Sequence, residues 1–342
     1  MMKFALVLLP FAIAVAAASI KTELCRDPEL RVEWRTMTEV QRDSYHKAVK
    51  CMQTKRVPSS GGMSQYDYFA WMYMAKYKEV HQTAAFLPWQ RYFSFAYDQL
   101  TKECGYSGHT PYWDWTKDAM NMTRSPIFDP VVGFGGNGKG QGNCVQDGPY
   151  GIQSGFKLRW PWEQCLQRKF AGMVSSPKGF LRPATGPEAR HSVKQVNALH
   201  RKKDFMNFAP GLEYLHHSVV SEIGLIMASS VPSLDPLFLV HINNIDRLWN
   251  LWQRKDDRTL GGYQNIVPIH PKGFPALTPP ASLDDLIKIG PKDFFWLKGF
   301  PELKVRDLLA TNSRRLCYTV SMVSLARVVR SNADGLVQVR QV

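Results

Sequence analysis

The sequence predicts a mainly α-helical fold, in which a bundle of helices is joined by long irregular loops and accompanied by little β-strand. Five stretches rich in apolar residues have helical composition. A region of about one hundred residues between the third and fourth of these is irregular. Only one stretch, near the C-terminus, is rich in strand-forming residues.

The first two predicted helices lie in the N-terminal quarter of the chain. Residues 40–52 show helical apolar spacing, and Thr38 with Gln41 forms a capping-box pattern just before them. Residues 58–62, PSSGG, break the helical pattern. Residues 64–80 contain no Gly or Pro and have the composition of a buried helix.

Three further helices and one strand are predicted downstream. Pro88 introduces a helix over residues 89–100, because proline is tolerated in the first turn. Residues 105–210 are predicted to be irregular. Two later helices follow, over residues 213–227 and 237–253. The Val, Leu and Tyr content of residues 318–329 favours a strand.

The composition is that of an ordinary globular protein. Of the 342 residues, 44% are hydrophobic and 21% are charged, which excludes an intrinsically disordered chain. The 43 Lys and Arg residues exceed the 29 Asp and Glu residues by 14. Because these cations are spread along the chain, we interpret the excess as solvated surface and expect no nucleic-acid partner.

The N-terminal residues have the pattern of a secretory signal peptide. Lys3 precedes an apolar run over residues 4–17, and three alanines at 16–18 stand before Ser19. The run is shorter than the ~20 residues that a membrane span needs, and Pro10 interrupts it. We therefore expect cleavage after residue 18, entry into the secretory pathway or secretion, and no membrane span.

The remaining chain is predicted to form one domain. Residues 19–342 would comprise a helical core at about 36–255 and an irregular C-terminal extension at 256–342. The six cysteines predict disulfide bonds in an oxidising compartment, and their fifteen pairings remain open. Asn121 begins an Asn-Met-Thr sequon, which predicts glycosylation, although a chance triplet is an equal alternative.

Three motifs give the sequence a more specific interpretation. Residues 86–93 read FLPWQRYF, residues 104–115 read CGYSGHTPYWDW, and residues 235–253 read DPLFLVHINNIDRLWNLWQ. In order and spacing these blocks resemble tyrosinases, in particular the short secreted tyrosinase-like proteins of fungi. The resemblance implies a four-helix bundle core around two copper ions, each bound by three histidines, that oxidises phenols with dioxygen.

The histidines expected at the first copper site are incomplete. The family pattern has a histidine, another eight residues later, and a third nine residues after that. His81 occupies the middle position, but Tyr73 and Gln90 occupy the other two. Gln90 lies inside the best-matched block, so misalignment does not explain the change.

The second copper site also has fewer histidines than the family pattern. It requires two histidines four residues apart, and either His216 or His217 is a candidate for the first of them. Val220 or Ser221 stands where the second histidine of the pair is expected. His241 matches the third position.

The resemblance therefore implies copper as cofactor, whereas the residues predict that a full dicopper centre is not formed. Three of six ligands are missing, and loss of even a supporting partner typically weakens metal binding 10–100-fold. The remaining candidate metal ligands are His81, His216, His217 and His241, and a single ion at His217 and His241 is one alternative. The other residues that match the family motifs are predicted to pack and form ion pairs within the bundle: Trp89, Arg91, Trp113, Asp114, Asp246, Arg247 and Trp249.

Three functions fit these observations. In the first, the chain acts in fungal secondary metabolism on an aromatic or phenol-bearing intermediate. The former copper cavity would then support non-redox chemistry such as cyclisation, with His81, Tyr73, His217 and His241 as catalytic groups. In the second, it is a copper-dependent oxidoreductase with unusual ligands, acting on phenols or on tyrosine-containing peptides. In the third, it is a non-catalytic secreted binding protein.

Overall fold

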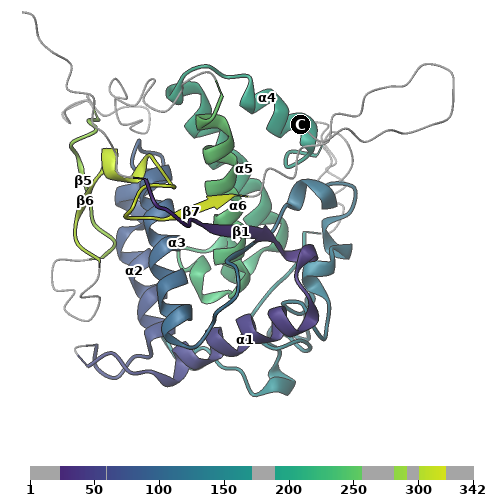
Figure 1. Cartoon of the computed structure of the whole chain (residues 1–342). Helices are drawn as coiled ribbons and strands as arrows, with labels where there is room; N and C mark the ends of the chain where they lie inside the picture. The colour runs from purple at the N-terminus through teal and green to yellow at the C-terminus, as the bar shows by residue number, and fades with distance from the viewer. Residues whose placement is uncertain (1–23, 59, 172–188, 256–280, 291–299, 321–342) are drawn as a thin grey trace, which may run out of the picture.

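The computed structural model describes residues 24–58, 60–171, 189–255, 281–290 and 300–320. Helices dominate these residues, and the strands are short (Figure 1). The α-helices of this part of the chain are α1 (Glu39–Thr54), α2 (Gln65–Val80), α3 (Phe86–Glu103), α4 (Val193–His200), α5 (Phe205–Ile223) and α6 (Leu237–Gln253). The mainly α-helical fold class is confirmed.

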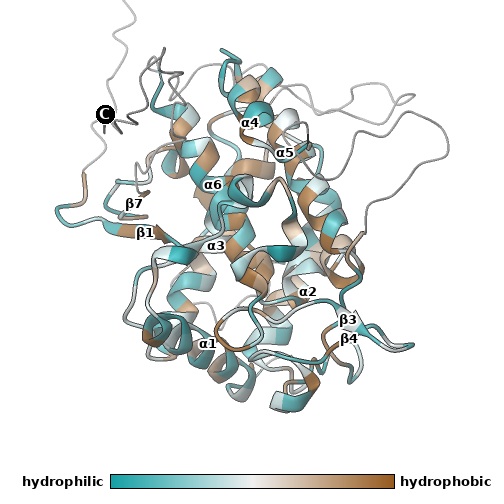
Figure 2. Ribbon diagram, turned by 90° about the vertical axis from the view of Figure 1, so that its right-hand side faces the viewer, coloured by the Kyte–Doolittle hydropathy of each residue, from teal (hydrophilic) through white to brown (hydrophobic). Residues whose placement is uncertain are grey.

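Four helices, α2, α3, α5 and α6, form the central bundle. Helix α3 contacts the other three, and α5 packs against α6. Helix α1 packs across α2 and α3 at one end of the bundle. Figure 2 shows that α1 is largely hydrophilic, whereas hydrophobic residues are frequent along α5 and α6. Nearly all of α6 is buried, from Leu237 to Asn250, which makes it the central helix of the bundle.

The local signals at three helices agree with the prediction. Thr38 and Gln41 form the predicted capping box at the start of α1. Ser64 caps α2 by accepting a hydrogen bond from the amide of Asp67. Pro88 lies in the first turn of α3, where its missing N–H has no helical partner to lose.

The predicted irregular region over residues 105–210 was too long, and the fourth helix was placed too late. Helix α4 and the first residues of α5 lie inside that region. Asp204 caps α5 through the amide of Asn207, and the helix continues past Pro210 at its sixth position. Helix α5 ends at Gly224, whose φ of +74° favours glycine, and residues 225–228 form a separate 3-10 helix.

Strand pairing brings residues near the two ends of the described chain side by side. Strand β1 (Glu29–Glu33) lies between β2 (Pro111–Tyr112) and β7 (Tyr318–Val320), and both pairings are parallel. The rest of the strand predicted for residues 318–329 lies outside the described residues. The other strands form two small antiparallel pairs, β3 (Gly138–Lys139) with β4 (Cys144–Val145) and β5 (Leu286–Ile287) with β6 (Leu303–Lys304).

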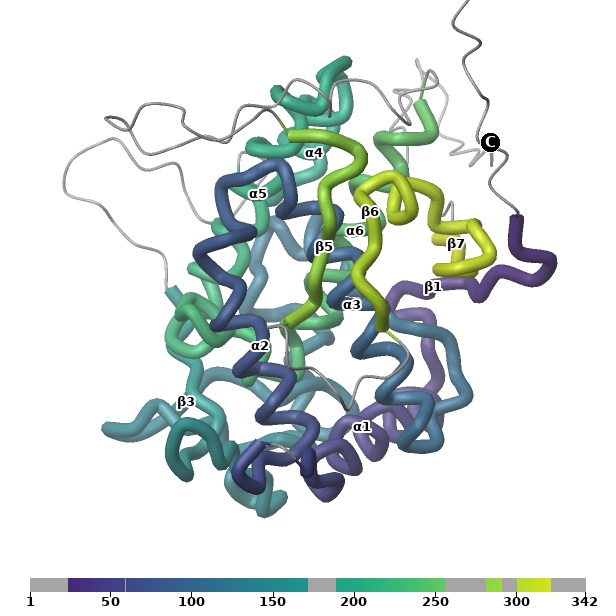
Figure 3. Tube along the Cα trace, turned by 90° about the vertical axis from the view of Figure 1, so that its left-hand side faces the viewer, coloured from purple at the N-terminus to yellow at the C-terminus, as the bar shows by residue number. Residues whose placement is uncertain are grey.

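The described C-terminal residues pack along α3. Trp89 donates its indole N–H to the carbonyl of Lys288, and Tyr92 donates its hydroxyl to that of Pro301. Figure 3 shows β5 and β6 running in front of α3, with β7 beside β1. One side of α3 is thus covered by the described C-terminal residues, and its other side packs against the other helices.

A buried ion-pair cluster lies where strands β1 and β7 meet helices α3 and α6, and it is formed by Arg31, Arg91, Asp98, Asp246 and Tyr318. Arg31 donates to Asp98 at 2.8 Å and to Asp246 at 2.9 Å. Asp246 also accepts from Arg91 and from the hydroxyl of Tyr318. Because these groups are almost fully buried, their charges must compensate one another. The predicted framework role of Arg91 and Asp246 is confirmed.

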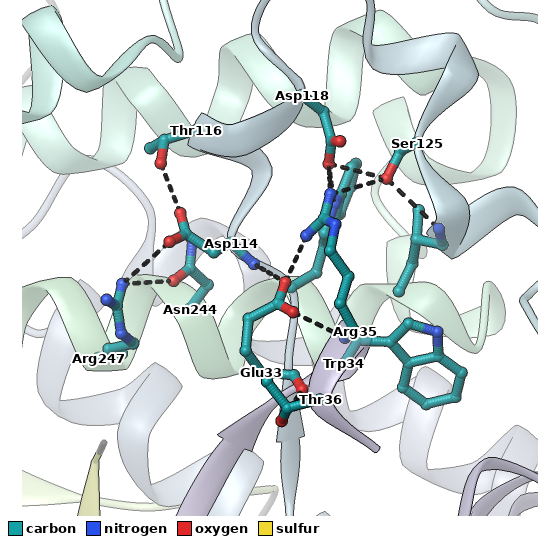
Figure 4. Close-up of polar contacts among 12 residues, drawn as sticks. Glu33, Trp34, Arg35, Thr36, Asp114, Thr116, Asp118, Ser125, Asn244 and Arg247 are labelled. Atoms are coloured by element: carbon teal, nitrogen blue, oxygen red, sulfur yellow. Dashed lines mark hydrogen bonds and ion pairs between the residues drawn. The ribbon is translucent and has the colours of Figure 1, made fainter. Parts of the chain in front are cut away.

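A second polar network joins the N-terminal strand to the loop after β2 (Figure 4). Glu33 and Asp118 both pair with Arg35, and Ser125 donates to Asp118 at 2.7 Å. Next to them, Asp114 accepts from Thr116 and lies 3.9 Å from Arg247. Asp114 and Arg247 thus also hold the framework, as predicted.

Three disulfide bonds complete the structure. They join Cys25 to Cys317, Cys51 to Cys104, and Cys144 to Cys165, and no described cysteine is free. The first of them holds the segment before β1 next to the segment before β7. None of the helices described here has the length and apolar character that crossing a membrane requires.

Candidate functional site

His81 lies at the C-terminal end of α2 and connects two of the predicted site positions. Its Nε2 is 2.9 Å from the hydroxyl of Tyr73, which lies two turns earlier on the same helix. Gln90, on α3, donates from Nε2 to the same Tyr73 hydroxyl at 2.8 Å. The three residues at the first copper-site positions therefore hydrogen-bond to one another in a chain.

Glu213, on α5, is the other partner of His81. Its carboxylate Oε1 lies 2.9 Å from His81 Nδ1 and accepts from the backbone N–H of Gln82 at 2.9 Å. A carboxylate has no proton to donate, so His81 Nδ1 is the donor and His81 Nε2 accepts from Tyr73. Gln82 has a φ of +59°, a left-handed conformation that directs its amide to this carboxylate.

The protonation states of these groups follow from burial and hydrogen bonding. Burial lowers the pKa of His81, although Glu213 opposes the shift, so His81 is neutral at pH 7. Burial alone would raise the pKa of Glu213, but the neighbouring His217 and the hydrogen bonds from His81 and Gln82 together lower it. Burial raises the pKa of Tyr73 well above its usual value, so its phenol keeps its proton.

His217 lies one turn after Glu213 on α5 and borders a cavity. Its Nε2 is 3.7 Å from Glu213 Oε1, and its side chain is 39% exposed. The cavity has a volume of about 240 Å³. Its walls are mainly apolar, and the residues that line it include Phe86, Phe205, Met206, Pro210, Glu213 and His217.

His216 and His241 form a separate buried pair beside this cluster. His216 Nδ1 lies 2.9 Å from His241 Nε2, and the two rings stack at 5.1 Å. Burial lowers the pKa of His241 to about 3 and that of His216 well below its usual value. His241 Nδ1 has no hydrogen-bond partner among the described residues.

The tertiary structure thus brings the predicted site residues together. The ring of His81 lies 5.8 Å from that of His216 and 5.5 Å from that of His217, measured between centroids. The donor atoms of His81, Glu213 and His217 all lie within 4.8 Å of one another. Glu213, rather than His241, is therefore the residue placed beside His217 as a candidate metal ligand.

Glu213 was not identified from the sequence. A usable signal was present, because Glu213 stands four residues before His217 and so lies on the same face of a helix. The expected start of the helix at residue 213 made this residue look like an N-terminal one. In the structure it lies in the third turn of α5 and points into the bundle.

The donor set does not fit a pair of coppers that each need three imidazoles. At the first site His81 Nε2 is hydrogen-bonded to Tyr73, and neither Tyr73 nor Gln90 supplies an imidazole. At the second site, the two buried imidazoles are hydrogen-bonded to each other. Val220, at the position one turn after His216, is aliphatic and cannot coordinate.

Comparisons with known proteins agree with the fold and the motifs. Residues 63–255 match the family profile described as the common central domain of tyrosinase. Tyrosinase ustQ of Aspergillus flavus is 32% identical over 314 residues, which cover 86% of this chain and 80% of the relative. The tyrosinase-like protein phomQ2 of Diaporthe leptostromiformis is 31% identical, with 87% and 74% covered.

Two further proteins are similar over most of the chain. N-acetyl-6-hydroxytryptophan oxidase ivoB of Emericella nidulans is 25% identical, with 90% of this chain and 96% of the relative covered. Among solved structures, a polyphenol oxidase from Thermothelomyces thermophila superposes with a TM-score of 0.64. At 24% identity, and with 86% and 89% of the chains covered, that structure supports the fold alone.

Proposed function

Because the chain belongs to the tyrosinase family, we propose that it is a biosynthetic enzyme acting on a hydroxylated aromatic intermediate beside Glu213 and His217. The observation that supports this most directly is the cavity at these two residues. The substrate class is also that of one relative, whose name specifies an indole with a ring hydroxyl. Fungal secondary metabolism is the proposed setting, because the most similar relatives reported above are fungal proteins.

The size and lining of the cavity suit one aromatic ring. A dry cavity of about 150 Å³ can hold benzene, and this one has about 240 Å³. Phe86 and Phe205 offer ring faces for stacking, while Glu213 and His217 offer polar groups at one edge. A ring hydroxyl oriented to that edge would reach an acceptor oxygen of Glu213.

The chemistry proposed here is acid–base catalysis without a coupled dicopper centre. Glu213 is ionised, is oriented by the amide of Gln82, and accepts from neutral His81. Because its pKa is lowered, Glu213 would take the proton of a bound hydroxyl only as a new bond forms at that oxygen, and the half-exposed His217 offers a route for the proton to solvent. In ring closure by addition, the hydroxyl oxygen would form a C–O bond to an activated double bond of the same intermediate while its proton passes to Glu213, and the neighbouring carbon would take up one proton in return. Tyr73 then positions His81, while His216, which is hydrogen-bonded to His241, packs against Phe86 of the cavity wall.

The secretory route is part of the same proposal. Residues 1–18 would be removed as a signal peptide, and residues 19–342 would form one domain with its helical core at about 36–255. Three disulfide bonds support an oxidising compartment. Asn121 is exposed and would be available for a glycan there.

The proposal is tested by deleting the gene in its host and by assaying the purified chain. We expect an aromatic intermediate to accumulate on deletion, and the purified protein to convert it without added copper. N-acetyl-6-hydroxytryptophan, the compound in the name of the Emericella nidulans relative, is a suitable binding probe, because it carries a ring hydroxyl. An unchanged metabolite profile would contradict the proposal and favour a binding protein without catalysis.

A copper-dependent phenol oxidase is the second candidate, and the names of the relatives favour it. Copper analysis separates the two. Two coppers per chain, an absorption band from bound dioxygen and quinone formed from a simple monophenol would establish the oxidase and exclude the proposal above.

A further inference from the structure

We propose that His81, Glu213 and His217 bind a single divalent transition-metal ion such as Zn²⁺, with an open coordination position facing the cavity. This site goes beyond the proposed function, because the ion can bind whatever the substrate is. It also differs from a paired copper site. It has one ion in place of two, and a carboxylate takes part in binding it.

The distances among the three side chains suit one ion. Zinc binds imidazole nitrogen at about 2.0–2.1 Å and carboxylate oxygen at about 2.0–2.2 Å, so its ligand atoms lie roughly 3 to 3.5 Å apart. Glu213 Oε1 is 2.9 Å from His81 Nδ1 and 3.7 Å from His217 Nε2. A small rotation of the half-exposed His217 would bring its Nε2 into this range.

The ligand types also favour such an ion. Two histidines and one carboxylate are the protein ligands of several catalytic zinc sites, which keep their fourth position for water or substrate. Glu213 supplies a carboxylate, and no Lys or Arg is found among the described residues that line the cavity beside it. The amide of Gln82 holds the carboxylate in place before any ion arrives.

His81 can offer Nδ1 to an ion only if its proton moves to Nε2, and the surrounding residues allow this. With the proton on Nε2, His81 would donate to the oxygen of Tyr73. Tyr73 would then donate its own hydroxyl proton to the amide oxygen of Gln90. Turning the Gln90 amide breaks no other bond, because its Oε1 has no partner among the described residues.

The open position of the ion would face the cavity that we assign to the substrate. Glu213 and His217 both line this cavity, so an ion between them would be accessible from it. A coordinated hydroxyl group loses its proton more readily than a free one. An ion here would therefore orient and acidify a substrate hydroxyl, and only this consequence rests on the proposed function.

Titration of the purified, chelator-stripped protein with ZnCl₂ tests the site. We expect one ion per chain by calorimetry, and Glu213→Gln and His217→Ala should each weaken binding at least 10–100-fold. Glu222→Gln is the matched control, because this carboxylate lies on the same helix outside the site and should leave zinc affinity unchanged. Circular dichroism confirms that each variant is folded, and the half-exposed His217 can be replaced without opening the core.

Three results would overturn the site. They are no zinc binding by folded wild-type protein, binding that survives both substitutions, and two ions per chain. Zinc binding without conversion of any aromatic intermediate would instead contradict the proposed function and leave the metal site intact. An X-ray absorption spectrum of the zinc-loaded protein should show two imidazole ligands and one carboxylate.

Discussion

Two buried polar clusters lie in the same helical bundle and differ in how they satisfy their polar atoms. The ion-pair cluster is built mainly from charged side chains, and Asp246 is paired on several sides. The second, which we call the histidine cluster, comprises Tyr73, His81, Gln90, Glu213, His216, His217 and His241. Most of its contacts are between neutral groups, and two of its buried atoms, Gln90 Oε1 and His241 Nδ1, have no partner within the described residues.

The two clusters include residues from the same helices, and residues adjacent in sequence can belong to different clusters. Gln90 and Arg91 are consecutive on α3, yet Gln90 contacts Tyr73 and Arg91 contacts Asp246. Where each charge is compensated by another, removing one leaves an unpaired buried charge, which is costly. Neutral side chains that exchange hydrogen bonds can be replaced at lower cost. Replacing a member of the ion-pair cluster should therefore cost more stability than replacing a neutral member of the histidine cluster.

The strongest test of this comparison is to remove the shared carboxylate of the ion-pair cluster. Asp246→Ala should lower the free energy of unfolding by about 3–5 kcal/mol, because Arg31 and Arg91 would remain buried without their partner. Urea denaturation measures the change. Asp43→Ala, which breaks an exposed pair with Lys47, should cost less than about 1 kcal/mol. Equal losses in the two variants would contradict the assigned importance of the buried cluster.

The next effect concerns activity rather than stability. Glu213→Gln should reduce conversion of the accumulated aromatic intermediate about 100-fold or more, because the amide cannot accept the hydroxyl proton as a carboxylate does. The readout is kcat for that intermediate, with Glu222→Gln as the control variant. Conversion at the wild-type rate by Glu213→Gln would remove Glu213 from the proposed chemistry.

The pH dependence of stability should depend on the buried histidines. Burial lowers the pKa of His241 to about 3, and an unfolded histidine has a pKa of about 6.5. The unfolded chain therefore binds a proton that the folded chain does not. The contribution of His241 to the free energy of unfolding is therefore complete above pH 6.5. It falls by roughly 1.4 kcal/mol per pH unit as the pH decreases from 6.5 toward 3.

Urea denaturation at pH 7 and pH 5 checks this expectation. Relative to wild type, His241→Leu should show a smaller loss of stability between the two pH values, because one titrating group is gone. His46 and His191 have pKa values of about 4 for the same reason, so part of the wild-type loss should remain. An identical loss in wild type and variant would show that His241 is not the neutral buried group described above.

The smallest effect is expected at Gln90. Gln90→Leu should change the free energy of unfolding by no more than about 1 kcal/mol. It removes a hydrogen bond to Tyr73, but it also removes a buried amide oxygen that has no partner. Thermal unfolding measures the difference. A loss as large as that of Asp246→Ala would make the two clusters equally important for stability.

Much of the fold could be predicted from the sequence because its signals are local. The capping residues Thr38 and Ser64, and the apolar composition of α6, each act over a few positions. Helix α4 and the early start of α5 were missed because their local signals are weak or misleading. A short helix has few residues to establish a period, and Pro210 lies inside a helix that tertiary packing stabilises although proline disfavours helix interiors.

The candidate site could be predicted only in part. His81, Tyr73, Gln90 and His241 stand inside or beside motifs of fixed spacing, so their positions could be read directly. Glu213 lies outside any motif, and its partner His81 is 132 residues away in the sequence. A contact over that separation depends on how α2 and α5 pack, which no local pattern specifies.

By itself, the amino-acid sequence determined that this is a helical tyrosinase-family chain with fewer histidines than a copper pair requires, because motif spacing and residue identity are properties of the chain alone. The tertiary structure decided what the remaining histidines do. His216 and His217 are adjacent, but a helix turns by about 100° per residue, so His216 faces His241 in the core and His217 faces Glu213 and the cavity.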